Sequence, residues 1–140
     1  MPYPDNLKFA NKSESICRKL GVTPATIGII DGCVCVGLSF DQLAFICNNK
    51  KNQKISRRDI GVAITNRWSG GTTVSATMQI SYNVGIRVFS TGGIGGVHRG
   101  FNKSLDVSQD LLSLKETPMV VISSGAKAIL DIGKTIENLE

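Results

Sequence analysis

The spacing of apolar and polar residues predicts a helix followed by a β-hairpin in the first part of the chain. Apolar side chains in residues 6–20 fall loosely on one helical face, and Gly21 is a common helix terminator. Two apolar runs, 25–30 and 33–38, flank Asp31-Gly32. This dipeptide is a strong hairpin signal because it accepts the positive φ angles of a two-residue turn. We therefore expect one helix and two antiparallel strands here.

Beyond the hairpin, helical and extended patterns alternate. Ser39 followed by Gln42 is a capping-box pattern that opens a short helix through Ile46, and Asp59 is expected to cap a helix that continues to Trp68. Further helices are predicted over 72–83, 108–114 and 125–140, and strands over 86–91 and 118–123. Strands that alternate with helices build mostly parallel sheets. The predicted fold class is α/β, with a mixed, mostly parallel sheet flanked by helices in a single α/β/α domain.

The composition is that of an ordinary globular domain. The 140 residues are 41% hydrophobic and 19% charged, which is enough apolar material for a core. The longest apolar runs fall far short of the ~20 residues that span a bilayer, and residues 1–4 show no basic-then-apolar leader. We expect a cytoplasmic protein that has no membrane partner.

The net charge indicates an anionic ligand. Sixteen Lys and Arg residues against eleven Asp and Glu residues give a formal charge of +5. The basic residues are spread along the chain and do not interleave with the few aromatic ones, as they do on single-strand-binding surfaces. Phosphate on a small molecule suits this distribution better than a nucleic acid. Four cysteines and a single His argue against a zinc site and for reduced thiols in a cytosolic core.

Lys127 is the first candidate for chemistry. It follows the predicted apolar strand and a Ser-Ser-Gly-Ala stretch, and we expect it in the first turn of the last helix. The positive end of a helix dipole and partial burial would both favour the neutral amine, which a Schiff-base nucleophile needs. Asp131, four residues further on, is placed to orient it. The plain alternative is a solvated surface lysine with an ordinary helical ion pair.

A glycine-rich stretch provides the second candidate. Residues 92–96 hold four glycines, whose backbone amides can turn toward a ligand, and His98-Arg99 follows to supply a titratable group and a fixed cation. The stretch is not a dinucleotide fingerprint, because His98 stands where the last glycine of that motif belongs. A tight turn beneath a helix is the equally open alternative.

Two further clusters are compatible with a phosphorylated, hydroxylated ligand. Asp106 and Asp110 flank Ser108 at a predicted helix start, where they suit Mg²⁺, Mn²⁺ or sugar hydroxyls. The alternative is that Asp106 or Ser108 only caps the helix. Lys54 precedes the charged stretch 55–59, which favours phosphate binding and a solvated loop equally.

Read in order, these stretches resemble the pseudouridine-5′-phosphate glycosidase family, also known for the indigoidine synthase A-like protein. The most specific stretch is Thr91-Gly92-Gly93-Ile94-Gly95-Gly96-Val97-His98-Arg99-Gly100. The other matching stretches are residues 1–4, 22–27, 36–38, 54–59, 71–78, 106–111 and 125–131. Together they run nearly from end to end of the sequence.

The resemblance implies reversible cleavage of the carbon–carbon glycosidic bond of pseudouridine 5′-phosphate to uracil and ribose 5-phosphate. In the family a Lys attacks C1′, opens the ribose and forms an imine, and by position that Lys is Lys127. The resemblance also implies a homotrimer and a divalent cation, usually Mn²⁺, held by Asp106. The residues that it places at the substrate are Lys54, Val74, Ser108, Gln109 and Asp110, with His98 in the loop near the base or the phosphate.

Length separates this sequence from the family pattern. Family members are about twice as long, and their general acid is a Glu in a strand upstream of the position that matches Met1. The resemblance therefore implies a partial domain over residues 1–140 with impaired catalysis, since a positioned proton donor contributes about 10²–10⁴-fold. A phosphosugar- or nucleotide-binding remnant that does no chemistry is the alternative. A basic nucleic-acid-binding module is the weakest hypothesis.

Overall fold

The structure is a computed structural model, and it describes residues 1–100 and 106–140. The chain divides into two compact units, which are described separately. The first comprises Met1–Lys54 and Gly61–Gly71, and the second comprises Ile55–Ile60 and Thr72–Glu140. The prediction of a single partial domain stays a prediction.

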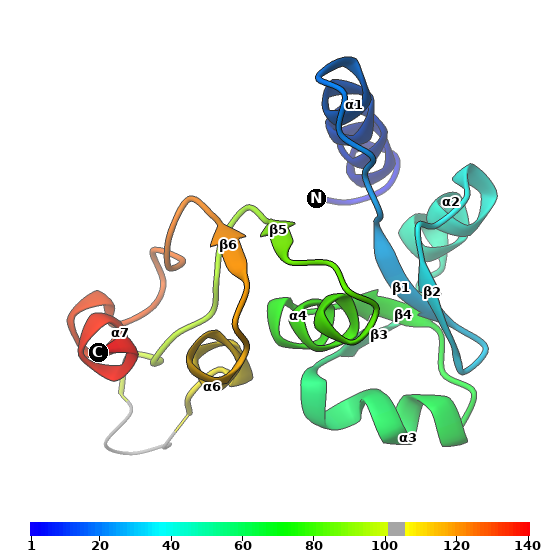
Figure 1. Cartoon of the computed structure of the whole chain (residues 1–140). Helices are drawn as coiled ribbons and strands as arrows, with labels where there is room; N and C mark the ends of the chain where they lie inside the picture. The colour runs from blue at the N-terminus through cyan, green and yellow to red at the C-terminus, as the bar shows by residue number, and fades with distance from the viewer. Residues whose placement is uncertain (101–105) are drawn as a thin grey trace. The chain divides into compact units, whose positions relative to one another are not determined.

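The elements alternate between helix and strand along most of the chain, as Figure 1 shows in its colour sequence. In chain order they are α1 (Asp5–Lys19), β1 (Ile27–Ile30), β2 (Cys33–Val36), α2 (Phe40–Asn48), β3 (Gln53–Ile55), the 3-10 helix η1 (Arg57–Asp59), α3 (Ile60–Thr65), β4 (Gly70–Thr72), α4 (Val74–Asn83), β5 (Val88–Ser90), α6 (Gln109–Glu116), β6 (Val120–Ile122) and α7 (Ile132–Leu139).

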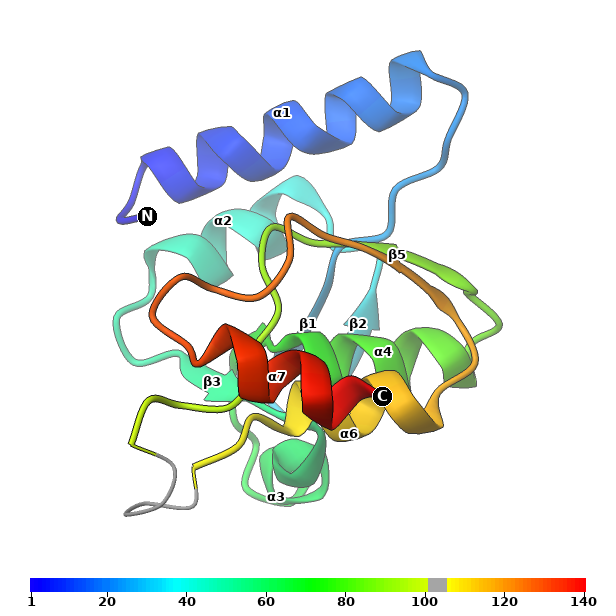
Figure 2. The same ribbon diagram turned by 90° about the vertical axis from the view of Figure 1, so that its left-hand side faces the viewer.

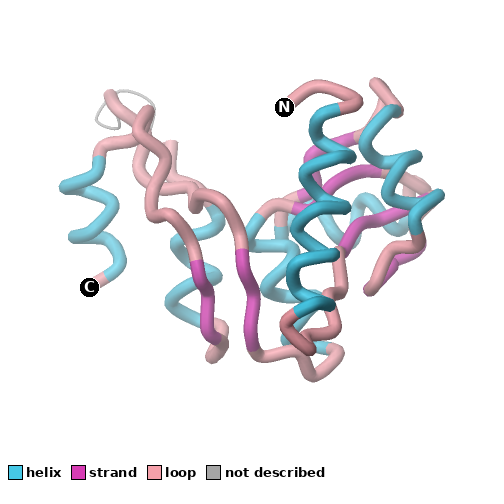
Figure 3. Tube along the Cα trace, turned by 90° about the horizontal axis from the view of Figure 1, so that it is seen from above, coloured by secondary structure: helices cyan, strands magenta, loops and turns pink. Residues whose placement is uncertain are grey.

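The predicted hairpin is confirmed in the first unit. β1 pairs antiparallel with β2, and Asp31 and Gly32 take φ angles of 47° and 76° at the turn. β1 also pairs antiparallel with β4, in a four-stranded sheet of order β2-β1-β4-β3. Figure 3 shows the strands of this sheet in magenta.

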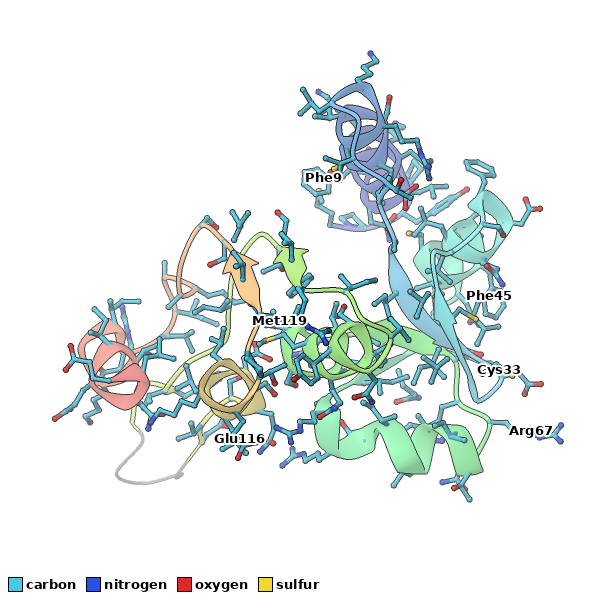
Figure 4. All side chains as sticks on the ribbon, viewed as in Figure 1. Phe9, Cys33, Phe45, Arg67, Glu116 and Met119 are labelled. Carbon is cyan, nitrogen blue, oxygen red and sulfur yellow. The ribbon has the colours of Figure 1, made fainter. Side chains whose placement is uncertain are left out.

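Both helices predicted before residue 50 are present. At α2, the Ser39 hydroxyl accepts the Gln42 N–H at 3.3 Å and the Gln42 side chain accepts the Ser39 N–H at 2.9 Å, which confirms the capping box. Within the described chain, α1 has no buried side chain. Its Phe9, labelled in Figure 4, is 58% exposed.

The helix expected from Asp59 to Trp68 is wrong in its cap and in its extent. Ser56 is the N-cap of η1, and Asp59 is the third residue of that capping box, accepting the Ser56 N–H at 2.9 Å. The α-helical part is α3, which ends at Thr65. The capping-box signal was present in the sequence, but it begins three residues earlier than predicted.

The second unit has its core between α4 and the parallel pair β5–β6. Val74, Met78 and Ile94 are buried there, and Phe89 and Val121 pack against them from the inner face of the two strands. Met119, labelled in Figure 4, packs against the same cluster. Helix α4 packs on α6, and α6 packs on α7 (Figure 2).

The helix predicted over 125–140 is present only in its second half. Residues 125–131 are irregular, and α7 begins at Ile132 with Asp131 as its N-cap, accepting the Lys134 N–H at 3.2 Å. Gly125 has a φ of 95°, which is outside the helical region. The expectation that Lys127 lies in the first turn of a helix is therefore wrong.

The α/β class with mixed strand pairing is confirmed. Parallel pairing occurs between β5 and β6. β1 is antiparallel to β2, as their tight hairpin requires, and it is also antiparallel to β4. Among the described helices, none is long and apolar enough to cross a membrane.

Candidate active site

Two segments that leave the carboxyl ends of β5 and β6 are bonded to each other along their length. We call residues 92–100 the glycine loop and residues 124–131 the lysine segment. The Ile94 N–H donates to the Gly125 carbonyl at 3.0 Å, and the Lys127 N–H donates to the Ile94 carbonyl at 3.3 Å. The Asp131 N–H donates to the Val97 carbonyl at 2.9 Å. Ligands bind beyond the carboxyl ends of parallel strands, so this region is the candidate site.

Asp110 fastens the glycine loop to the start of α4. The residue is 6% exposed, and its carboxylate accepts the Gly95 N–H at 2.8 Å and the Ser75 N–H at 2.9 Å. A Cβ on Gly95 would collide with the Ser108 side chain and lie 2.8 Å from Asp110 Oδ2. Only glycine fits this approach. The Asp110 carboxylate is thus occupied by backbone donors.

Thr135 fastens the same loop from the side of α7. It is 1% exposed, accepts the Val97 N–H at 3.0 Å and donates to the Asp131 carbonyl at 2.7 Å. A Cβ on Gly96 would come within 2.5 Å of its hydroxyl. No sequence motif pointed to Thr135. The one sequence feature related to Thr135 is Gly96, whose lack of a side chain leaves room for a close neighbour.

These bonds correct one expectation about the glycine loop. The amide of Ile94 donates to a carbonyl, as does that of His98, while those of Gly95 and Val97 are taken by Asp110 and Thr135. These four amides therefore hold the loop in shape and do not turn toward a ligand. Gly95 is the one of the four glycines among these donors, so the expectation of a ligand-facing amide is wrong for Gly95, and the choice between ligand binding and a tight turn stays open for the rest of the stretch.

Ser108 and Gln109 lie at the start of α6. Ser108 is its N-cap, accepting the Asp110 N–H at 3.2 Å, and its own N–H donates to the Gly96 carbonyl at 3.0 Å. The helix-cap alternative is confirmed for Ser108. Gln109 is the first residue of the helix and is half-buried. The substrate roles of both residues stay predictions.

Asp106 pairs with His98 of the glycine loop, and both side chains are open to solvent. His98 Nδ1 lies 3.9 Å from Asp106 Oδ2, and their side chains are 43% and 59% exposed. Among the residues that the structure describes, no three His, Cys, Asp or Glu side chains gather into a group that could enclose a metal ion. One exposed carboxylate still fits a hard divalent cation that keeps most of its water.

Lys127 is exposed, so the predicted burial of its side chain is wrong along with its predicted place in a helix. The two structural features on which the sequence argument for Lys127 rested are therefore not observed. Its aliphatic stem lies along Gly93, where a Cβ would stand 3.3 Å from Lys127 Cγ. Asp131 caps α7 and pairs with Lys134 at 3.7 Å.

Arg99 donates to the backbone of the lysine segment. Its Nη2 lies 3.1 Å from the Ala128 carbonyl and its Nε 3.4 Å from the Leu130 carbonyl. The sequence suggested a cation for phosphate or a ring carbonyl. The structure instead places these two donors on main-chain oxygens.

Two predicted substrate residues, Val74 and Lys54, belong neither to the glycine loop nor to the lysine segment. Val74 is 8% exposed within the core of its unit, which leaves its backbone as the part able to meet a ligand. Lys54 is exposed on β3 and belongs to the other unit. In the charged stretch that follows, Arg57 pairs with Glu116 at 2.6 Å. The roles of Val74 and Lys54 stay predictions.

The sequence pattern of the family described as indigoidine synthase A like protein matches residues 1–140. The chain belongs to this family. It is 52% identical over 140 residues to a pseudouridine-5′-phosphate glycosidase of Roseobacter denitrificans and 52% identical over 141 residues to one of Arabidopsis thaliana. These alignments cover 100% of this chain but only 45% and 43% of the two relatives.

Two solved structures superpose closely on the chain. An indigoidine synthase A-like protein from Thermotoga maritima matches with a TM-score of 0.92 and 36% identity, over 99% of this chain and 46% of that one. The prealnumycin C-glycosynthase AlnA in complex with ribulose 5-phosphate matches with a TM-score of 0.89 and 44% identity, over 98% of this chain and 45% of its own. The chain thus spans less than half the length of the proteins that it matches.

Proposed function

We propose that this chain forms the part of a pseudouridine-5′-phosphate glycosidase that holds the phosphorylated ribose and presents Lys127 to its C1 atom. The observation that carries the proposal is the bonding of the lysine segment to the glycine loop, which gives Lys127 a defined place beyond β5 and β6. The names of the curated relatives and the phosphosugar in the AlnA complex support it.

The proposed chemistry is imine formation. The Lys127 amine gives up a proton, its nitrogen bonds to the C1 aldehyde of open-chain ribose 5-phosphate, and one water leaves. In the cleavage direction, the Lys127 nitrogen bonds to C1′ as the bond between C1′ and O4′ breaks, and O4′ takes up a proton, which gives a ring-opened amine adduct. The nitrogen lone pair then forms the C1′=N bond of the imine as the bond between C1′ and C5 of uracil breaks. The electrons of that bond return to C5, which takes up one proton. Water then releases ribose 5-phosphate from Lys127.

The remaining site residues are proposed to orient the ligand. Ser108 would meet the sugar phosphate through its hydroxyl and Gln109 through its backbone N–H at the start of α6. Asp110 would support both from beneath the ligand, since its carboxylate accepts two N–H groups and its own N–H donates to Ser108. The backbone of Val74 would add a further contact, and a substrate role for Lys54 stays a prediction from the family resemblance. His98 flanks them beside Asp106.

Mn²⁺ or a related divalent cation is proposed at Asp106. When bound, the cation would neutralise negative charge on the substrate. Asp106 would hold it through one carboxylate while water fills most of its coordination sphere. The homotrimer and the cytoplasmic location stay predictions from the family resemblance.

Borohydride trapping tests the proposal. Reduction in the presence of ribose 5-phosphate should fix an adduct on Lys127, located by peptide mass spectrometry, and Lys127→Arg should abolish it. Lys134→Arg is the matched control, because Lys134 lies in the next helix and pairs with Asp131. No adduct, or an adduct on another lysine, in a demonstrably folded sample would rule the proposal out.

A phosphosugar-binding protein without catalysis is the second candidate. The exposure of Lys127 favours it, because the sequence predicted a nucleophile from partial burial of this side chain. Calorimetry combined with an assay for uracil release separates the two functions. Binding of pseudouridine 5′-phosphate without turnover and without an adduct would favour this second candidate.

A further inference from the structure

Arg99 is the one side chain of the glycine loop whose charged group is bonded to the lysine segment. Its guanidinium reaches across to two carbonyls, at 3.1 Å on Ala128 and 3.4 Å on Leu130. These carbonyls stand one and three residues beyond Lys127. A planar guanidinium holds two acceptors in fixed relation to each other, which a flexible ammonium cannot do.

The two carbonyls belong to the turn that follows Lys127. The Leu130 N–H donates to the Lys127 carbonyl at 3.0 Å and closes this turn. The Asp131 N–H then donates to Val97, and Thr135 anchors Asp131 from within α7. Backbone bonds therefore fix both ends of the lysine segment, while Arg99 fixes the carbonyls of its middle.

Gly93 completes the frame on the other side of Lys127. The Lys127 stem lies along it, at 3.3 Å from Cγ to the position of an added Cβ. Gly93 contacts the Lys127 stem, and the turn that follows Lys127 is held by Arg99. The direction of the Lys127 side chain therefore depends on the backbone that Arg99 holds. Misplacement of a reacting group by about 1 Å can slow a reaction by about 10²-fold.

We propose that Arg99 is a positioning residue that orders the turn after Lys127 and so aims the amine at the substrate. This inference rests on the proposed function. It differs from a phosphate-binding role, which the charge and place of Arg99 in the sequence would suggest. Loss of a positioning residue should slow the reaction of Lys127 with any sugar aldehyde, whereas loss of a phosphate-binding residue should slow it only with a phosphorylated sugar.

Trapping rates with two aldehydes distinguish them. Arg99→Gln should slow borohydride trapping on Lys127 about 10-fold with ribose 5-phosphate and by the same factor with unphosphorylated ribose. Arg99→Lys should recover part of the rate, because one ammonium can meet one carbonyl. Slowing with ribose 5-phosphate alone would show phosphate binding and overturn the inference, as would unchanged rates with both sugars.

Arg87→Gln is the matched control. The Arg87 guanidinium likewise donates to two carbonyls, those of Tyr82 at 2.9 Å and Ile86 at 3.2 Å, but it does so at the end of α4. Its replacement removes the same charge and the same kind of contact, and it should leave the trapping rate unchanged. A loss equal to that of Arg99→Gln would mean a general effect on stability and would overturn the inference.

Amide hydrogen exchange tests the ordering role of Arg99 independently of any reaction at Lys127. In Arg99→Gln, the amides of Leu130 and Asp131 should exchange faster than in the parent, and Arg87→Gln should leave them unchanged. Unchanged exchange in Arg99→Gln would overturn the inference even if Lys127 traps no sugar. A folded parent that traps no sugar, with faster exchange in Arg99→Gln, would instead remove the proposed function and leave the ordering role of Arg99.

Discussion

The side chain of Asp110, a residue of one of the matching motifs, holds two segments of backbone together. The resemblance places it at the substrate, and the structure gives its carboxylate two backbone donors from different elements, at Ser75 and Gly95. Hydrogen bonds to a buried charged group are among the stronger ones in proteins. At this residue the sequence could not indicate that the carboxylate is bonded to two backbone N–H groups, and its role at the substrate stays a prediction.

Asp110→Asn should therefore reduce stability. The amide that replaces one oxygen would point donors at a backbone N–H, so we expect a loss of about 1–3 kcal/mol in the free energy of unfolding. Urea denaturation measures it. Asp106→Asn is the matched control, because the Asp106 side chain is 59% exposed and should change stability by less than about 0.5 kcal/mol. Equal losses of stability in the two variants would contradict the inference that Asp110 fastens the glycine loop to α4.

Gly93→Ala should disturb Lys127 selectively. Its added Cβ would press on the Lys127 stem at 3.3 Å, whereas a Cβ on Gly92 has nothing within 4 Å. We expect Gly93→Ala to slow borohydride trapping several-fold, on the order of 3- to 10-fold, and Gly92→Ala to leave it unchanged. Similar rates in both variants would show that Gly93 does not guide the lysine.

At the level of elements, β5 and β6 present two unlike faces. Phe89 and Val121 pack on the core of their unit, while Val88, Val120 and Ile122 on the other face are 59%, 58% and 56% exposed. The nearly continuous apolar runs predicted these strands, because parallel strands are ordinarily covered on both faces. The runs could not tell which face packs within this chain.

A pair of neighbouring substitutions measures the difference between the faces. Val121→Ala should lower the free energy of unfolding by about 1–2 kcal/mol, since two partly buried carbon groups that pack on the core are lost. Val120→Ala makes the same change one residue away on the exposed face and should alter it by less than about 0.5 kcal/mol. Thermal or urea unfolding gives both values, and a larger effect at Val120 would contradict the assignment of faces.

The lysine segment is the element that local sequence could not predict. Residues 125–140 contain enough helix formers to suggest one continuous helix, but the first seven bond instead to the glycine loop through the bridges at Ile94 and His98. Tertiary hydrogen bonds between segments far apart in sequence override local helix propensity there. Asp131 at the true helix start was a visible cap signal.

The η1 capping box gives a pH-dependent contribution to stability. Hydrogen bonds from the Ser56 hydroxyl and N–H lower the pKa of Asp59 below its ordinary value, and Arg58 adds to the shift. A carboxyl whose pKa is lower in the folded state stabilises the fold above its unfolded pKa and loses that contribution as the pH falls through the folded pKa. In Asp59→Asn this acid-sensitive contribution should disappear.

The measurement is the free energy of unfolding at pH 6 and near pH 3. The stability difference between the parent and Asp59→Asn should be about 1 kcal/mol at the higher pH, as for loss of a helix cap, and should shrink at the lower one. Asp5→Asn is the control, because Asp5 only pairs with Lys8 at 3.4 Å on the surface. A difference that grows as the pH falls would contradict the sign argued from Asp59.

At the scale of the whole molecule, the family and fold class could be predicted from motifs that run along the sequence. The division into two units could not, because Ile55–Ile60 groups with Thr72–Glu140, whereas Gly61–Gly71 groups with Met1–Lys54. Such grouping depends on which distant residues meet, and this information is absent from local periodicity. The placement of Lys54 and Val74 in different units has the same origin.

The net charge of +5 leads to a prediction about ionic strength. Basic side chains and the overall positive field should both attract the phosphate of ribose 5-phosphate. Salt weakens this attraction, because the screening length is about 10 Å at 0.1 M. By calorimetry, Kd for ribose 5-phosphate should rise several-fold between about 50 and 300 mM KCl, while Kd for ribose should not change.

The steepness of that dependence also separates a phosphosugar from a nucleic acid. One phosphate displaces few ions, so log Kd should change with log salt concentration with a slope of about 1, whereas a protein that contacts 6–10 nucleic-acid phosphates shows a slope of roughly that number. Tight RNA binding with a steep slope, or salt-independent binding of ribose 5-phosphate, would contradict the assignment of the positive charge to one small anionic ligand.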